Sequence, residues 1–414
     1  MLPVIEHLHL IGSLPHRSLC DLARKHGPDV MLLRLGAVPT LVGAKAVLCT
    51  HDHVFASRPR FTVANILFNG STDVSFAPYS EYWRQARKVV TAHLLAPGKV
   101  RSGRAAREQE VRLVMARVRD AAAARMVVDL TELFSFFANG IVCQDMVAPR
   151  GGGGGGFNLD DYFPSFARLG FVSARAVKHK KRWDDLLDSL IGKHASKTTE
   201  SNEDEHEDED FIDAVLMDMF AAGVDTTCIA LDFALAELMR KPQAMAKLQA
   251  EVRRCAWEGK EMVTEAANLS SMSYLKAVMK ESMWLHAPGP LLIPHFSMAD
   301  CDVEGYTVPS RTRVLVNSAE EFKPERFLEE AMDAASDFQG NDFCFLPFGS
   351  GQRICPAINF TTATFEIILA NHVYHFNWEL PPGSTGIDMS ESFGIYVHCQ
   401  ENVLLIPSLA HQDV

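Results

Sequence analysis

The segment Phe345–Phe360, which reads FLPFGSGQRICPAINF, holds one cysteine in a glycine-rich turn that leads into an apolar helical pattern. Two glycines, Gly349 and Gly351, allow a tight turn that points backbone amides at the sulfur of Cys355. Arg353 places a permanent cation two residues earlier, and the following helix presents the positive end of its dipole. Because a buried thiolate is tolerated only where amides, cations or a metal stabilise its charge, the turn predicts a metal-binding thiolate.

Two interpretations of Cys355 follow from the residues alone. Free cysteine is among the most buried residue types, so a buried and chemically inert thiol is the simpler alternative. The functional interpretation is a thiolate ligand of haem iron, which pushes electron density onto the metal and favours cleavage of an O–O bond. The segment by itself leaves both interpretations open.

The composition excludes several other classes of protein. The chain has 414 residues, 47% of them hydrophobic, which is enough for a large buried core. Its net charge is −12, and eight of its acidic residues lie in the segment 200–210, so no basic surface indicates binding to nucleic acid. The nine cysteines are odd in number and form no Cys-x-x-Cys pair, which argues against a disulfide scaffold or a zinc ribbon.

The hydrophobic pattern predicts a mainly α protein with a small β portion. Residues Phe211–Arg240 form the longest helical pattern and are apolar almost all round, as expected of a helix through the centre of a large protein. Further helices are expected at 81–94, 105–124, 244–255, 274–285 and 360–375. Short β-like segments occur in VMLLRLG and PTLVG, after residue 290, and in the tail IYVHCQENVLLIP, which alternates like a hairpin.

One domain spanning residues 1–414 is the expected organisation. Six consecutive glycines at 151–156 and the self-repelling acidic segment 196–210 are predicted to be flexible loops. Both segments could instead be interdomain linkers. Because apolar helical patterns flank each of them, loops within one large helical domain are the preferred interpretation.

The cysteine turn resembles the haem-binding signature of the cytochrome P-450 family, Phe-x-x-Gly-x-Arg-x-Cys-x-Gly. Phe348, Gly351, Arg353 and Cys355 match it, and Ala357 stands where the family has its final glycine. The resemblance covers nearly the whole chain, and the residues around the cysteine are similar to those of plant microsomal members. It implies the cytochrome P-450 fold, a large helical domain around a haem with short β-sheets. It further implies haem b (iron protoporphyrin IX) as the cofactor, with Cys355 as the iron ligand and Arg353 paired with a propionate.

The long apolar helix carries AAGVDTT at Ala221–Thr227, which resembles the family's oxygen-activation motif. Gly223 has no side chain, so the helix can approach a flat macrocycle there. The hydroxyls of Thr226 and Thr227 can bond back to carbonyls one turn earlier and open the helix slightly. The resemblance makes Thr226 the hydroxyl that bonds bound oxygen and Asp225 a proton relay. Without the resemblance, a buried helix with Asp225 in a salt bridge is the plainer interpretation.

Three further residues resemble the family's propionate-binding positions. The sequence EYWRQARK places Trp83 and Arg87 four residues apart on one helix face, where both side chains can donate hydrogen bonds. His295, in LLIPH, matches a third such position. Without the resemblance, the helix would be an amphipathic surface helix and the histidine an ordinary structural residue.

The chain departs from the family pattern in several respects. In KESMWLH, Glu281 is present but Trp284 stands where the family has an arginine, which breaks an ion-pair network with Arg326 of EFKPERF. Removing one partner from a buried ionic network typically costs about 3–5 kcal/mol. Ala357 adds a methyl group where a glycine lets the next helix approach the haem. Two internal stretches and the membrane-anchoring helix of the family are also missing, so a shortened member is expected.

The resemblance implies a haem-thiolate monooxygenase that inserts one oxygen atom of O2 into a small hydrophobic metabolite of plant secondary metabolism. Electrons would come from NADPH through an NADPH-cytochrome reductase at the cytoplasmic face of the endoplasmic reticulum membrane, although this chain shows no anchor helix. The segments that would contact substrate are mostly apolar and suit indole-type or terpenoid metabolites, and they lie at 61–74, 219–220, 291–293 and 393–396.

Other functions remain as alternatives. A degenerate, catalytically impaired relative that binds haem or ligand weakly would account for Trp284 and Ala357. A rearranging enzyme of the same fold that needs no O2 is disfavoured by Thr226. A nicotinamide-dependent dehydrogenase is disfavoured because no Gly-x-Gly-x-x-Gly follows a predicted strand.

Overall fold

The computed structural model describes most of the chain outside one long central gap. The described residues are 6–27, 30–43, 46–68, 70–142, 205–256, 262–265, 269–315, 324–328, 338 and 345–410. At residues 46, 205–217 and 326 the description is of the backbone alone. The predicted glycine loop at 151–156 lies outside the described residues.

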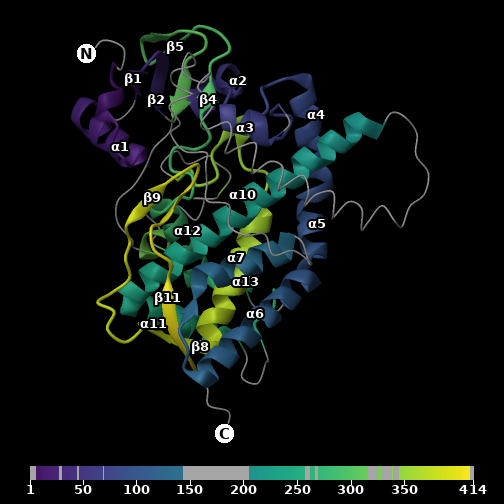
Figure 1. The fold of residues 1–414 in the computed structure, drawn as a ribbon, viewed down its shortest axis with the longest axis vertical. Helices are drawn as coiled ribbons and strands as arrows, with labels where there is room; N and C mark the ends of the chain where they lie inside the picture. Colours follow the sequence, from purple (N-terminus) through teal and green to yellow (C-terminus); the bar gives the residue numbers. More distant parts are fainter. Residues whose placement is uncertain are drawn as a thin grey trace.

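Helices form the body of the molecule, and α10 (Glu205–Arg240) runs through its middle (Figure 1). Helices that pack along it include α7 (Leu130–Val142), α12 (Ser273–Leu285) and α13 (Ile358–His375). Residues 227–238 of α10 are buried without interruption, which explains an apolar pattern on every face of the helix. Its segment Asp218–Arg240 is long and apolar enough to span a membrane, but 67% of its most apolar window is buried inside the protein, as in a core helix.

Seven further helices occur among the described residues. They are α1 (Pro15–His26), α2 (Asp52–Phe55), α3 (Thr62–Leu67), α4 (Glu81–Val89), α5 (Pro97–Ser102), α6 (Arg104–Ala124) and α11 (Pro242–Cys255). Short 3₁₀ or π turns lie at Leu8–Leu10, Ala46–Thr50, Val90–Leu94, Leu269–Ser271, Pro324–Phe327 and Gly351–Arg353. The mainly α fold class predicted from the hydrophobic pattern is confirmed among the described residues.

Local chemistry fixes where these helices begin. The hydroxyl of Ser80 accepts a hydrogen bond from the backbone N–H of Trp83 at 3.1 Å, which caps the first turn of α4. Pro242 occupies the first turn of α11, where a missing N–H costs nothing, so α10 ends at Arg240 and the next helix starts at once. The cap on α4 matters for the site because this helix carries Trp83 and Arg87.

The β portion consists of small sheets. One has the order β1-β2-β7-β4 and contains β1 (Val30–Leu35), β2 (Val38–Gly43), β7 (Arg313–Leu315) and β4 (His295–Phe296). A second, β3-β11-β8, contains β3 (Val128–Asp129), β11 (Leu404–Leu409) and β8 (Phe376–Glu379). Two ribbons pair β9 (Glu391–Phe393) with β10 (Val397–Cys399), and β5 (Cys301–Val303) with β6 (Tyr306–Val308).

Two expectations from the sequence were wrong in detail. The alternating tail is not one hairpin, because β10 pairs with β9 while β11 pairs with β8 and β3. Strand partners are chosen by packing across the fold, which local alternation does not report. The acidic segment is not a loop throughout, since α10 already begins at Glu205, and acidic residues favour the positive end of a helix dipole.

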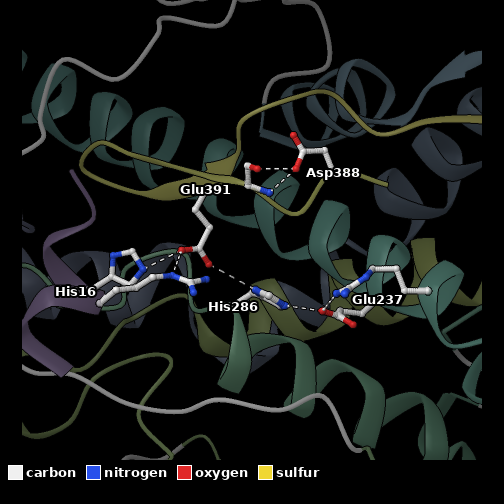
Figure 2. A network of polar contacts seen from close by, with 8 residues as sticks. His16, Glu237, His286, Asp388 and Glu391 are labelled. Carbon is white, nitrogen blue, oxygen red and sulfur yellow. Dashed lines mark hydrogen bonds and ion pairs between the residues drawn. The ribbon is translucent and has the colours of Figure 1, made fainter. Parts of the chain in front are cut away.

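A polar network links the N-terminal helix to the helical body (Figure 2). His16 Nε2 and Arg17 Nε of α1 lie 3.0 and 2.8 Å from Glu391 Oε2 on β9. His286, which follows α12, places Nδ1 4.0 Å from Glu391 Oε1 and Nε2 3.0 Å from Glu237 Oε1 on α10. Burial raises the pKa of Glu391, but hydrogen bonds from His16 and Arg17 more than offset this and lower the pKa to about 2. The network therefore holds a charged carboxylate between four elements.

Candidate functional site

The sulfur of Cys355 lies at the end of a turn that is ordered by its own backbone. The backbone N–H of Cys355 donates to the carbonyl of Phe348 at 2.9 Å, and the N–H of Ala357 points at the sulfur at 3.4 Å. Burial raises the pKa of the thiol, while the Ala357 amide and the nearby Arg87 guanidinium act in the opposite direction. The group is therefore a neutral thiol unless a metal cation takes the place of its proton.

Both glycines of the turn are required by the backbone. Gly349 and Gly351 have φ of +72° and +67°, in the left-handed region that disfavours residues with a side chain. A Cβ on Gly351 would lie 2.4 Å from Oδ1 of Asp52 on α2. The other oxygen of this carboxylate, Oδ2, accepts a hydrogen bond from the N–H of Gln352 at 3.1 Å, so α2 packs directly on the turn.

Trp83, Arg87 and Arg353 are brought together beside this turn. The guanidinium carbons of Arg353 and Arg87 lie 3.9 and 5.6 Å from the centre of the Trp83 ring. Arg353 is buried and donates to the carbonyls of Ala56 and Ala77 at 2.6 and 2.7 Å. Arg87 donates to the carbonyl of Ile354, next to the cysteine. These three residues form one cationic wall although α4 and the cysteine turn are far apart in sequence.

His295 and Arg58 extend this wall. Nδ1 of His295 lies 2.9 Å from the carbonyl oxygen of Phe55, and burial together with the Arg58 charge lowers the pKa of the imidazole well below its usual value. Arg58 is buried and donates to the carbonyls of Ser75 and Ile293 at 3.0 and 2.5 Å. Sequence reasoning missed Arg58, whose only signal was its position in the largely apolar run VFASRPRF.

The cationic wall is short of negative charge. Burial, followed by the charges of Arg353 and Arg87, lowers the pKa of Arg58, and burial and Arg87 lower the pKa of Arg353 to about 9. Asp73 opposes both shifts, but burial raises the pKa of its own carboxyl, so it is a weak counter-ion. Buried cations without anions are costly, and a bound group with two carboxylates would relieve that cost. The residues present therefore fit a haem, whose propionates are such carboxylates.

The motif on α10 has the back-bonded hydroxyls that the sequence predicted. Oγ1 of Thr226 donates to the carbonyl of Ala222 at 2.5 Å, and Oγ1 of Thr227 donates to the carbonyl of Gly223 at 2.8 Å. The α-helix nevertheless continues through this turn. A Cβ on Gly223 would meet only a side-chain carbon of Val142 at 3.9 Å, so the described protein atoms leave this face of the helix open.

Tyr396 connects the helix motif with the cysteine turn. Its hydroxyl donates to the carbonyl of Ala221 at 3.2 Å. Its pKa is raised by burial first, and then by the charges of Asp225, Asp218 and Cys355. The half-buried phenol of Tyr396 therefore contacts the motif on α10 and senses the charges of Asp225 and Cys355, although the sequence assigned Tyr396 only to a substrate-contacting segment.

The departures from the family pattern lie close to the core. Glu281 on α12 is fully buried, and Trp284 packs partly buried against the main hydrophobic cluster. The side chain of Arg326 lies outside the described residues, so the three-way network stays a sequence prediction. Ala357 packs with Phe360 against a buried apolar cluster that includes Val74. Phe348 packs edge-on against Phe338, with ring centres 5.1 Å apart.

Comparisons with known proteins agree with this geometry. A family model described as Cytochrome P450 matches residues 1–157 and 170–406. Indole-2-monooxygenase of Zea mays is 46% identical, over 99% of this chain and 86% of that protein. 3-Hydroxyindolin-2-one monooxygenase of Zea mays is 44% identical, over 99% of this chain and 87% of that protein. A zebrafish cytochrome P450 structure with abiraterone has a TM-score of 0.77 at 22% identity, covers 97% of this chain and 100% of that chain, and shows the same fold.

A half-buried thiol in a glycine turn, a wall of arginines and a central threonine-bearing helix are the features of a haem-thiolate protein. The chain belongs to the cytochrome P450 family, and its class of activity is that of an oxidoreductase that incorporates oxygen. The family and fold predicted from the cysteine turn are thus confirmed. The alignment with indole-2-monooxygenase runs over 466 residues, more than the 414 of this chain, so that relative carries internal stretches with no counterpart here.

Proposed function

We propose that the protein is a monooxygenase that carries haem b and inserts one atom of O2 into a small hydrophobic metabolite of indole type. The second oxygen atom leaves as water, and the two electrons come from NADPH through an NADPH-cytochrome reductase at the cytoplasmic face of the endoplasmic reticulum. The observation that carries the proposal is the half-buried Cys355 sulfur beside a cationic wall whose acidic neighbour, Asp73, is a weak counter-ion. When bound, the haem supplies the iron at which O2 is reduced.

Two groups of residues would hold the cofactor. Cys355 is the iron ligand, and the Ala357 amide and Arg87 stabilise the charge of its thiolate. Arg353 and Arg87 would bind the propionates as cations, with the neutral imidazole of His295 beside Arg58, whereas the indole N–H of Trp83 already donates to the carbonyl of Val74 at 2.9 Å. The role of Phe348 and Gly351 is to shape the turn, and the role of Gly223 is to leave room on the opposite side.

Proton delivery is assigned to α10. The Thr226 hydroxyl is held by the Ala222 carbonyl, so its oxygen is fixed and its lone pairs are free to accept a further hydrogen bond. Asp225 lies on the same turn of the helix, and its charge acts on the half-buried Tyr396. We assign Thr226 as the hydroxyl that would hydrogen-bond the O2 substrate and Asp225 as the carboxyl that would relay protons toward it.

An aromatic cluster supports the substrate class. Phe68 and Phe76 stack with ring centres 5.4 Å apart, and Phe61 meets Phe76 edge-on at 5.7 Å. Ile293, Ile395 and Ala221 pack against the same cluster, so three segments that sequence analysis assigned to substrate contact meet there, together with α10. A wall of aromatic rings suits a flat apolar ligand. Two of the curated relatives act, by their names, on indole and an indolinone.

A carbon monoxide difference spectrum tests the proposal. Purified protein loaded with haem and reduced under carbon monoxide is expected to give the red-shifted Soret band of a thiolate-ligated iron. Cys355→Ser should remove that band while leaving bound haem detectable. The alternative is that the protein is a degenerate, catalytically impaired member of the family that binds haem or ligand weakly. The uncharged Trp284 favours this alternative. A wild-type spectrum without the red-shifted band would reject the monooxygenase in favour of this relative.

A further inference from the structure

Residues 72–77, which we call the clamp loop, connect the aromatic cluster to the start of α4, and their backbone is bound from α10. Oδ2 of Asp218, in the middle of α10, accepts hydrogen bonds from the N–H groups of Val74 and Ser75 at 2.7 and 3.3 Å. More than 140 residues separate the carboxylate from these amides. The contact therefore fixes the loop to the central helix rather than shaping it locally.

Asp73 lies within the clamp loop and is completely buried. Its Oδ2 accepts a hydrogen bond from the N–H of Phe76 at 2.7 Å. Its Oδ1 is buried and has no hydrogen-bond donor among the described residues. The Asp218 carboxyl binds the two preceding amides, so carboxyls from α10 and from the loop itself hold three consecutive amides. Two ionised carboxylates on neighbouring amides repel each other, whereas one proton between them would supply a hydrogen bond to Oδ1 of Asp73.

The carbonyl groups of the clamp loop point to the cationic wall. The carbonyl oxygen of Ser75 accepts from Nε of Arg58 at 3.0 Å. The carbonyl oxygens of Val74 and Ala77 accept from Arg353 at 3.3 and 2.7 Å. Carboxyl groups thus accept hydrogen bonds from the amides of the loop. The carbonyls of the loop accept hydrogen bonds from the guanidinium groups that would face the cofactor. Any movement of the loop away from α10 would move both arginines.

We propose that Asp73 and Asp218 share one proton and act as positioning residues that fix the clamp loop to α10, thereby placing Arg58 and Arg353 for the carboxylates of the cofactor. The link to the cofactor rests on the function proposed above, whereas the carboxyl pair and its hold on the loop do not. Arg58 and Arg353 would contact the cofactor, and the two aspartates would act through them.

The surroundings of the pair favour the shared proton. Burial raises the pKa of both carboxyls, and the charge of Asp218 further disfavours ionisation of Asp73, whereas the Asp73 side chain lowers the pKa of Asp218. The other titratable or charged groups that face the pair are Arg58 and Arg353 across the loop and Tyr396 beside α10. The arginines favour one negative charge on the pair, and a second charge would leave the two carboxylates in direct repulsion.

Amide hydrogen exchange tests the carboxyl pair in the whole protein as purified. Protection of the amides at 74–76, corrected for intrinsic exchange at each pH, should fall in wild type as pH rises and the shared proton is lost. In Asp73→Asn the side-chain amide donates an N–H in place of that proton. Protection of the amides at 74–76 should therefore be high and independent of pH in this variant. Asp218→Ala should lower protection of these amides about tenfold or more, and Asp218→Asn should restore most of it. If protection of these amides depends on pH in the same way in wild type and in Asp73→Asn, the two carboxyls do not share a proton.

Transfer of haem to excess apomyoglobin tests the link to the cofactor. Asp218→Ala should release haem about tenfold faster than wild type. Haem release from wild type should become faster at high pH, where the shared proton is lost, and Asp73→Asn should remove that increase. Asp302→Asn, which changes an exposed carboxylate on the separate β5–β6 ribbon, is the matched control and should behave as wild type. Unchanged haem release with reduced amide protection would overturn the positioning role. Wild-type protein that takes up no haem would reject the proposed function. The exchange data would still show whether Asp73 and Asp218 share a proton and hold the clamp loop.

Discussion

At the scale of single residues, Gly351 shows how the turn depends on the absence of a side chain. Its φ of +67° is one that residues with a Cβ rarely adopt, and the neighbouring Asp52 carboxylate fills the space that a Cβ would need. Gly383 has a similar φ of +84° but no heavy atom within 4 Å of the same position. The two glycines therefore separate the cost of the backbone conformation from the cost of close packing.

We expect Gly351→Ala to lower the free energy of unfolding by about 2 kcal/mol or more, because backbone strain and displacement of Asp52 add together. Gly383→Ala should cost only about 1 kcal/mol, since strain acts alone there. Urea denaturation of the two variants, with m-values checked for equality, measures the difference. Equal losses in both variants would contradict a packing requirement at Gly351.

At the scale of elements, α12 carries the departure that bears most on activity. Glu281 is fully buried on this helix, and Trp284, one turn later, packs against the main hydrophobic cluster instead of supplying a second charge. A buried acid depends on cationic or hydrogen-bonding partners, so the identity of residue 284 affects how α12 is held beneath the site.

Trp284→Arg is expected to increase retention of haem, because a guanidinium would restore the charged partner that the family pattern places beside Glu281. Haem content after gel filtration, compared with that of wild type, is the measurement. Trp284→Leu keeps an apolar residue without charge and serves as the control. If the arginine variant holds no more haem than wild type, the broken network does not explain any impairment of this chain.

At the scale of the whole molecule, Glu391 joins elements from both ends of the chain. It binds His16 and Arg17 of α1 and faces His286, which in turn binds Glu237 of α10 (Figure 2). Ion pairs between distant segments stabilise only the folded chain. The depressed pKa of Glu391, about 2, is the signature of that stabilisation.

Stability should therefore depend on pH through Glu391. Its pKa is lower in the folded chain than in the unfolded chain, so the stabilisation is complete above the unfolded pKa and disappears as pH falls toward 2. Glu391→Gln should lower the free energy of unfolding by about 2 kcal/mol at pH 7, after allowance for solvent around Arg17. The difference from wild type should shrink below about pH 4.5.

Chemical denaturation at a series of pH values measures this difference. Glu81→Gln removes an exposed acid that pairs with Arg84 on α4 and is the matched control, with no measurable effect on stability. A difference between wild type and Glu391→Gln that stays constant from pH 7 to pH 2 would show that the carboxylate charge is not what holds these elements together.

Local features of the site could be predicted from the sequence, whereas long-range contacts could not. Gly349 and Gly351 indicate a tight turn because glycine adopts positive φ more readily than other residues. The threonine hydroxyls on α10 bond to carbonyls within their own helix turn, so this contact is also local. Arg58 escaped prediction because its partners, Ser75 and Ile293, are 17 and 235 residues away. The tail strands were paired wrongly for the same reason, since a strand's alternation shows its faces but not its neighbours.

The sequence by itself determined the mainly helical fold, the family and the cysteine turn, because these depend on residue spacing within one helix or one turn. Only the tertiary structure decided which carboxyls and guanidiniums meet around residues 72–77 and which elements Glu391 joins. Several of those contacts unite segments more than 140 residues apart, and their energies come from burial and from neighbouring charges that exist only after the chain has folded.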